Sequence, residues 1–165
     1  MTKFKKNDGK ILLSLLAVLA VMALIFVFSA QTGEQSGRTS GHIVTAILRI
    51  IVPELDQRTP AEQERIYHFC SLLVRKGAHF SVFALLGVTL MLHITALRQR
   101  FTVKCGWLWA WGIGILYAGS DEFHQTFVSG RGPALLDVGI DSCGVIAGVL
   151  LVLLCRRLLK RNREA

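Results

Sequence analysis

The sequence SDEFHQTFVSGRGPALLDVGID, residues 120–141, lies between two almost purely apolar runs and decides how the chain folds. The runs CGWLWAWGIGILYAG and SCGVIAGVLLVLLC come directly before and after it, and both are typical of membrane-spanning helices. Ionisable side chains cost several kcal/mol near the centre of a bilayer and are rarely placed there without partners or a purpose. The search for function therefore starts at the four carboxylates of this segment, Asp121, Glu122, Asp137 and Asp141.

The composition excludes an ordinary soluble domain and favours a single membrane domain over residues 1–165. Hydrophobic residues make up 52% of the chain and the mean hydropathy is +0.49. The formal net charge is +8, but the basic residues cluster beside the apolar runs, which argues against nucleic-acid binding and for a membrane protein. The four cysteines have no paired spacing, so neither a zinc site nor a disulfide framework is predicted.

Four membrane-spanning helices are predicted, which makes the fold class an all-α integral membrane protein. The first covers about residues 11–28, an uncharged run long enough to cross the hydrocarbon core. The others cover about residues 77–97, 105–121 and 135–154. A cleaved signal peptide is the alternative for the first helix. Its apolar region would be too long, however, and Phe28 fits badly at the small-residue position of a cleavage site ending at Ala30.

The outer segment, residues 29–76, joins the first two spans and is predicted to hold a polar loop and short amphipathic helices. Residues 29–41 are rich in Ser, Gly and Thr, which predicts a flexible loop. The next stretch, HIVTAILRIIV, predicts an amphipathic helix that lies in the membrane interface or on the protein's own surface and ends at Pro53. Residues 59–62, TPAE, form a capping box that begins the helix leading into the second span.

The distribution of Lys and Arg predicts the orientation in the plasma membrane. Twelve of the 19 basic residues lie in the N-terminal tail, the short 98–104 loop and the C-terminal tail. Short loops rich in Lys and Arg stay in the cytoplasm. Both termini are therefore predicted to be cytoplasmic, and residues 29–76 and 120–136 are predicted to face outward.

This topology brings polar residues of several helices to one depth at the outer face. A histidine and carboxylates at one depth could exchange protons, so the candidate catalytic residues are His79, Asp121 and Glu122. Basic side chains beside them could hold an anionic headgroup such as a phosphate. The candidate substrate-binding residues from this reasoning are Arg75, Lys76, Gln125, Arg131, Asp137 and Asp141.

Structural roles are the alternatives for these residues. Internal ion pairs could neutralise the charges and only lock the bundle. Asp137 could be a helix-start residue, Arg131 could lie beside lipid phosphates, and His124 is expected in a solvated loop. A metal site through His79, Asp121 and Glu122 has no ligand-spacing motif to support it, so no metal is predicted. His93 is expected in an interhelical hydrogen bond, and the spacing of Gly144 and Gly148 predicts close helix packing.

Three segments of the chain resemble the VanZ-like family of membrane proteins. They are FSAQTGEQSGRTSG, RKGAHFSVFALLG and DEFHQTFVSGRGPALLDVGIDSCGVIAGV. The family's pattern implies that Gln31 joins the site, together with Lys76, His79, Asp121, Glu122, Gln125, Arg131 and Asp137. Asp141 stands where the family often has asparagine. The resemblance further implies reduced susceptibility to teicoplanin-type lipoglycopeptides, without a settled reaction or a known cofactor.

The sequence therefore predicts a VanZ-like envelope protein that acts on, or binds, a membrane lipid or a lipid-linked cell-wall component. A non-catalytic protein that binds a lipid, a drug or a partner is one alternative. A small oligomeric transporter is the other, although four spans leave little room for a central pathway. The sequence leaves open whether the protein is an enzyme, which substrate it takes and whether it forms oligomers.

Overall fold

The computed structural model describes residues 2–132 and 134–164, which fold into α-helices and one short 3₁₀ turn without any strand. This confirms the predicted all-α fold class. The elements in chain order are α1 (Thr2–Ser29), α2 (Gly33–Ile51), η1 (Leu55–Gln57), α3 (Pro60–Leu97), α4 (Gly106–Gln125) and α5 (Leu135–Glu164).

Three of the described helices are long and apolar enough to cross a membrane: α1, α3 and α5. They contain the predicted first, second and fourth spans. The predicted third span corresponds to α4, which is not one of these three helices and which contains Asp121 and Glu122 near its C-terminal end. The chain is thus an all-helical protein with several apolar helices of membrane-spanning length.

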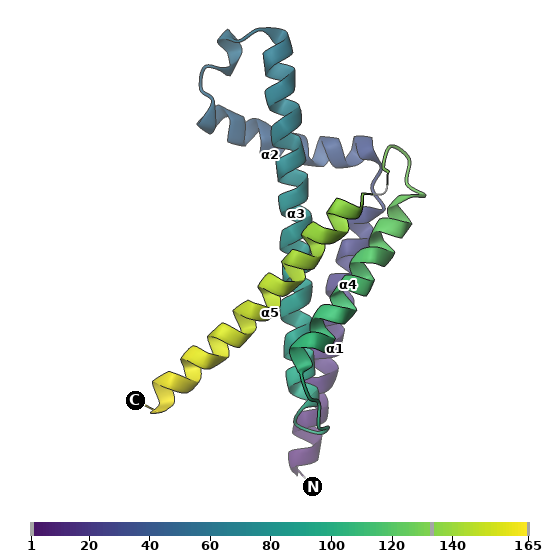
Figure 1. Ribbon diagram of the computed structural model, residues 1–165, viewed down its shortest axis with the longest axis vertical. Coiled ribbons are helices and arrows are strands. Elements are labelled where there is room, and N and C mark those ends of the chain that lie inside the picture. The colour runs from purple at the N-terminus through teal and green to yellow at the C-terminus, as the bar shows by residue number, and fades with distance from the viewer. Residues whose placement is uncertain (1, 133, 165) are drawn as a thin grey trace.

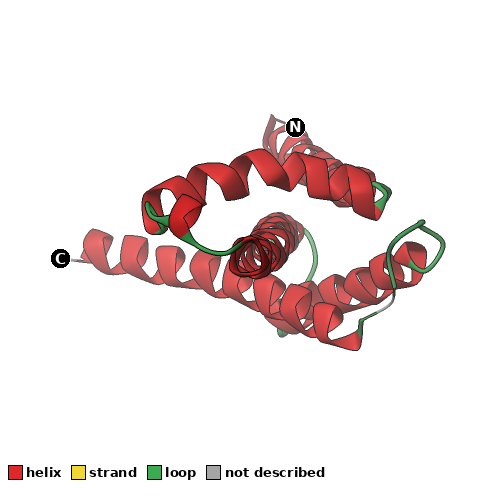
Figure 2. Cartoon of the chain, turned by 90° about the horizontal axis from the view of Figure 1, so that it is seen from above, coloured by secondary structure: helices red, strands yellow, loops and turns green. Residues whose placement is uncertain are grey.

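The central element is α3, which contacts α1, α2, α4 and α5. Seen from above, α3 stands at the centre, with α2 on one side of it and α5 on the other (Figure 2). Its buried residues include Phe83, Leu86 and Met91, which pack in one apolar core with residues of the other long helices. A long helix that is apolar on several sides packs on several neighbours, and this fixes the position of the other helices.

The closest helix contact joins α3 and α5 through glycines. A methyl group added at Gly144 would overlap the backbone carbonyl of Phe80, and one added at Gly148 would overlap that of Ala84. Small residues at such positions let two helix backbones approach closely. The predicted close packing at Gly144 and Gly148 is therefore confirmed.

The two ends of the bundle differ in what they carry. Both chain termini and the short connection between α3 and α4 point to one end, whereas α2 and the 126–134 loop lie at the other (Figure 1). The short connection makes α3 and α4 antiparallel neighbours, as predicted. We call the end that carries α2 the α2 end.

The prediction of a flexible loop over residues 29–41 is wrong, because α2 already begins at Gly33. Thr32 and Gln35 form a capping box, with the Gln35 amide N–H donating to Thr32 Oγ1 at 3.2 Å and the Thr32 amide N–H donating to Gln35 Oε1 at 3.1 Å. A capping box satisfies two free amide groups at a helix start and so favours a helix in a polar stretch. The predicted amphipathic helix is confirmed as the second half of α2, where Val44 and Leu48 are buried.

Other local predictions have mixed outcomes. The capping box at Thr59 is confirmed at the start of α3, and His93 Nδ1 lies 2.9 Å from Ser14 Oγ of α1, in the predicted interhelical hydrogen bond. The prediction of a solvated loop for His124 is wrong. This residue belongs to α4, and its ring stacks on Phe26 of α1 with the ring centroids 4.6 Å apart, so it helps to hold α1 and α4 together.

Candidate functional site

Polar side chains gather inside the α2 end of the bundle, where α1, α3, α4 and α5 converge. The buried polar residues among those described are Ser29, Ser36, Asp121, Glu122, Gln125 and Asp141. Four of these come from the ends of α4 and α5 that the segment 120–141 connects. Buried polar groups are normally hydrogen-bonded, so their partners show what each one does.

A hydrogen-bonded network joins α1 to α4, and we call its members Ser29, Asp121, Gln125 and Arg131 the polar network. Asp121 Oδ2 accepts hydrogen bonds from Ser29 Oγ at 2.6 Å and from Gln125 Nε2 at 3.0 Å. Arg131 Nη1 donates to Gln125 Oε1 at 3.1 Å. Asp121 and Gln125 face the same way because they are one helical turn apart. The network fixes the Asp121 carboxylate and ties the 126–134 loop to α4.

Two further contacts hold the start of α5. Glu122 Oε2 accepts a hydrogen bond from the backbone amide of Ala134 at 3.0 Å, and Asp137 in the first turn of α5 forms an ion pair with Lys76 of α3. Carboxylates are favoured near a helix N-terminus, where amide groups lack partners. The predicted helix-start role of Asp137 and its place in the site are therefore compatible.

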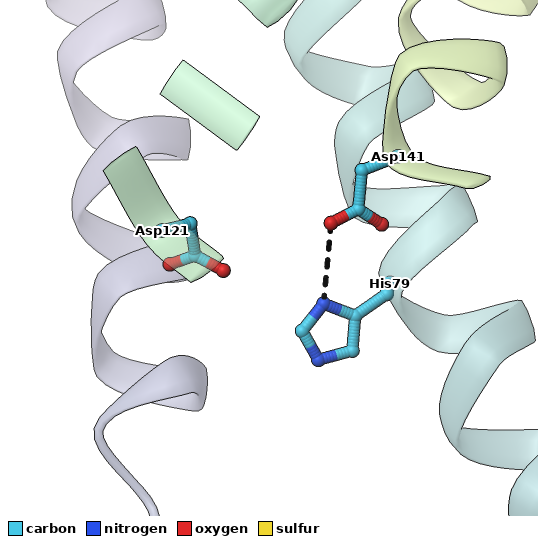
Figure 3. A group of neighbouring side chains, drawn as sticks. All are labelled: His79, Asp121 and Asp141. Carbon is cyan, nitrogen blue, oxygen red and sulfur yellow. Dashed lines mark ion pairs between the residues drawn. The ribbon is translucent and has the colours of Figure 1, made fainter. Parts of the chain in front are cut away.

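His79 and Asp141 face each other between α3 and α5, with Asp121 opposite them (Figure 3). His79 Nδ1 lies 3.8 Å from Asp141 Oδ2, which is an ion-pair distance but longer than a hydrogen bond. Asp141 is only 1% exposed, and neither of its carboxylate oxygens has a hydrogen-bond partner among the described residues. One ligand atom each from His79, Asp121 and Asp141 lie within 4.8 Å of one another.

Two cavities open beside this cluster and share Arg75, His79 and Arg131. The polar cavity has a volume of about 130 Å³. Its charged or polar lining residues are Arg75, Lys76, His79, Glu122, Gln125, Arg131, Asp137 and Asp141. The apolar cavity has a volume of about 220 Å³ and lies between α1, α2 and α3. Its lining includes Ile25, Phe28, Gln31, Ile43, Val74, Val82 and Phe83.

Arg131, in the loop between α4 and α5, is a cation in both cavity walls. Burial lowers the pKa of its guanidinium and nearby Arg75 lowers it further, whereas Asp121 and Glu122 raise it. Arginine keeps its charge throughout the physiological range because its ordinary pKa lies far above neutrality. The site therefore combines permanent cations with a histidine and several carboxylates, which suits binding of an anion and transfer of a proton.

The structure brings the predicted site residues to one end of the bundle. Eight of them line the polar cavity, Gln31 lines the apolar cavity, and Asp121 lies behind His79 and Asp141 in the cluster. Sequence reasoning missed Ser29, which is fully buried and donates to Asp121. The available signal was that this serine directly follows an apolar span and precedes a polar segment. The composition of residues 29–41, however, predicted a loop.

Comparisons with known proteins identify the family. A family model described as VanZ/LLP1 matches residues 14–156, whereas comparison with curated proteins and with solved structures found no match. The matched segment covers most of the chain and contains all the predicted site residues. It also confirms the resemblance seen in the sequence. The chain therefore belongs to the VanZ/LLP1 family.

Proposed function

We propose that the protein binds an amphiphile with an anionic headgroup, such as an envelope lipid or a lipid-linked cell-wall component. One observation carries the proposal: a polar, cation-lined cavity and an apolar cavity share the side chains of Arg75, His79 and Arg131. An amphiphile fits this pair, because its headgroup would enter the polar cavity and its hydrocarbon the apolar one. Ligand sites are mostly concave and apolar with a few convergent polar groups.

Arg75 is the best candidate for the headgroup contact. Lys76 is already paired with Asp137, and Arg131 already donates to Gln125. Among the described residues, Arg75 has no hydrogen-bond or ion-pair partner, although it lines both cavities. Its guanidinium can donate two parallel hydrogen bonds to a phosphate or a carboxylate. A bound anionic headgroup would thus give Arg75 the partner that the protein itself does not provide.

The proposed site faces outward in a four-span arrangement with both termini in the cytoplasm. Twelve of the 19 basic residues are in the two tails and the 98–104 loop, at the end opposite α2. Trp107 and Trp109 are exposed at that same end of α4, where aromatic rings favour a membrane interface. An impermeant maleimide should label a single cysteine at exposed Ser129, but not one at exposed Thr102, in intact cells. The reverse labelling pattern would mean that the site faces the cytoplasm.

A catalytic version of the proposal assigns proton transfer to His79 and Glu122, which line the same polar cavity. Expression in a susceptible Gram-positive host should then raise teicoplanin tolerance, and Glu122→Gln should abolish the effect at equal protein abundance. A non-catalytic binder would keep much of the effect in this variant. The two versions therefore differ in the outcome for Glu122→Gln.

Binding itself can be tested with the full-length protein in detergent. Micelles doped with phosphatidylglycerol should give saturable binding, and micelles doped with uncharged diacylglycerol should bind much more weakly. Arg75→Gln should weaken phosphatidylglycerol binding at least about tenfold, since losing one partner of a buried charge pair costs about 2 kcal/mol or more. Arg38→Gln is the matched control, because the Arg38 side chain is 80% exposed and pairs with Glu34 outside both cavities. Equal binding of the two lipids, or unchanged binding in Arg75→Gln, would contradict the proposal.

A further inference from the structure

We infer that His79, Asp121 and Asp141 bind a divalent transition-metal cation. Each of three different helices, α3, α4 and α5, supplies one of these side chains. One possible ligand atom from each lies within 4.8 Å of the others, and the three side chains point toward a common space (Figure 3). Because the helices bring these residues together from distant positions, no ligand-spacing motif marks the group in the sequence.

Asp141 provides the second, independent observation. It is 1% exposed, and both of its carboxylate oxygens are buried without a hydrogen-bond partner in the described chain. His79 does not satisfy it, because the 3.8 Å separation exceeds hydrogen-bond distance. Buried charges in proteins are normally paired or coordinate a metal. A cation between His79 and Asp141 would give this carboxylate a closer partner than the His79 ring at 3.8 Å.

The residues around Asp121 orient its carboxylate for binding the same cation. Its Oδ2 atom accepts hydrogen bonds from Ser29 and Gln125, which fixes the orientation of the carboxylate. Both of these hydrogen bonds go to Oδ2, so Oδ1 is the atom proposed to bind the cation. Hydrogen bonds from neighbouring side chains commonly orient metal ligands in this way. Ser29 and Gln125 are therefore positioning residues for the proposed metal ligand.

The donor set narrows the kind of cation. One imidazole nitrogen and two carboxylate oxygens suit Zn²⁺, Mn²⁺ or Fe²⁺ better than Ca²⁺, which prefers oxygen ligands alone. In a tetrahedral site, ligand atoms about 2.1 Å from the ion lie about 3.4 Å apart, so side-chain movements of at most about 1.4 Å would close the group. Three protein ligands leave coordination positions open toward the polar cavity, as in catalytic metal sites. This inference does not depend on the proposed lipid.

Manganese binding by the full-length protein tests the site. The protein is purified in detergent, stripped with EDTA and titrated with MnCl₂, and free Mn²⁺ is measured by electron paramagnetic resonance. Mn²⁺ is suitable because it prefers oxygen and nitrogen ligands, so the exposed cysteines do not compete. We expect one bound ion per chain. Binding should be at least about tenfold weaker in Asp141→Asn and His79→Ala, because loss of a residue that only supports a metal ligand already weakens binding by about that factor.

Matched controls separate the site from general effects of charge and of folding. Asp8→Asn removes an exposed carboxylate outside the cluster, and His93→Ala removes another histidine of α3. Both should keep wild-type manganese affinity. Asp141→Asn should fold in the absence of metal, because it removes a buried carboxylate that has no hydrogen-bond partner among the described residues, and circular dichroism checks this.

The absence of Mn²⁺ binding by the wild-type protein would overturn the inference, as would equal losses in the controls and in Asp141→Asn. Phosphatidylglycerol binding is measured separately on the EDTA-treated protein, so failure of the metal site and failure of the proposed function are distinguishable.

Discussion

Two buried aspartates on neighbouring helices have opposite surroundings. Asp121, on the side of the cluster formed by α1 and α4, accepts hydrogen bonds from Ser29 and Gln125. Asp141, on the side formed by α3 and α5, is equally buried, but neither of its oxygens has a hydrogen-bond partner in the described chain. Asp121 lies on α4 and Asp141 on α5, the two helices on either side of one loop. The difference therefore lies in the side chains of the helix that each aspartate faces.

The difference separates an aspartate that both stabilises the fold and is proposed to bind the cation from one whose proposed role is cation binding alone. A satisfied buried carboxylate stabilises the contact between two helices, whereas an unsatisfied one lowers stability until something binds it. The α1–α4 side is therefore expected to hold the geometry of the site. The α3–α5 side, with His79 and Asp141, is expected to bind the cation together with Asp121 but to add little to the stability of the metal-free fold. Three changes test this division, and they are ordered here by the size of the expected effect.

The largest effect is expected from separating α3 and α5. Gly148→Ala would place a methyl group against the backbone carbonyl of Ala84, which cannot move away as a side chain can. Overpacking at a rigid contact costs about 3 kcal/mol in severe cases. We expect a loss of that order in the free energy of unfolding, measured by denaturant titration in detergent, together with loss of the His79–Asp141 approach.

The matched control is Gly139→Ala on the same helix, because a methyl group at Gly139 meets no atom within 4 Å. Alanine favours a helix over glycine by about 1 kcal/mol, so this variant should be as stable as the wild type or more stable. If Gly148→Ala were as stable as Gly139→Ala, the α3–α5 contact would be looser than the structure has it.

The sequence predicted which polar residues lie together at the α2 end better than it predicted the segment before them. Asp121, Glu122 and Gln125 could be placed together because helical periodicity relates residues within one element. The start of α2 was missed although Thr32 and Gln35 have the capping-box spacing, because a polar composition was given more weight than the local motif. Both the polar composition and the capping-box spacing were present in the sequence, and the capping box determines where α2 begins.

The pairing of His79 with Asp141 could not be predicted, because it depends on how α3 and α5 cross. That crossing is set by contacts of Gly144 and Gly148 with the backbone of α3, and periodicity carries no information on the rotation of one helix against another. The sequence instead suggested His79 with Glu122 as the proton-transfer pair. Both line the polar cavity, but the ion-pair partner of His79 is Asp141. The four-span topology remains a prediction for α4.

The second prediction compares the two aspartates through the same substitution. Asp121→Ala leaves the buried side chains of Ser29 and Gln125 without their common acceptor, and an unsatisfied buried group costs about 1–3 kcal/mol. Asp141→Ala removes a carboxylate that has no hydrogen bond to lose. In metal-free protein, Asp121→Ala should therefore lower the free energy of unfolding by about 1–3 kcal/mol more than Asp141→Ala does.

Denaturant titration of both variants in EDTA measures this difference, and the equal size of the deleted group makes each variant the control for the other. Equal destabilisation would mean that the ion pair with His79 stabilises the fold as much as the hydrogen bonds of Asp121 do. The division between the two sides would then be wrong.

The smallest effect is expected at Ser29, the residue that sequence reasoning missed. Its hydroxyl donates to Asp121 Oδ2 at 2.6 Å from the last residue of α1. Ser29→Ala removes this donor but leaves Gln125 on the same carboxylate, so the loss should be about 0.5–1.5 kcal/mol in the free energy of unfolding. Ser142→Ala is the control, because the Ser142 hydroxyl donates only to a carbonyl of its own helix, at Val138.

A double-mutant cycle sharpens this last test. If Ser29 acts through Asp121, then Ser29→Ala should have less effect in an Asp121→Ala background than in the wild type, because the two residues share one interaction. Additive losses would show that Ser29 stabilises α1 on its own. Ser29→Ala should also weaken Mn²⁺ binding by less than His79→Ala does, since it loosens the orientation of a ligand without removing one. An equal loss of Mn²⁺ affinity would mean that Ser29 does more than orient Asp121, and Ser29 would then not be a positioning residue.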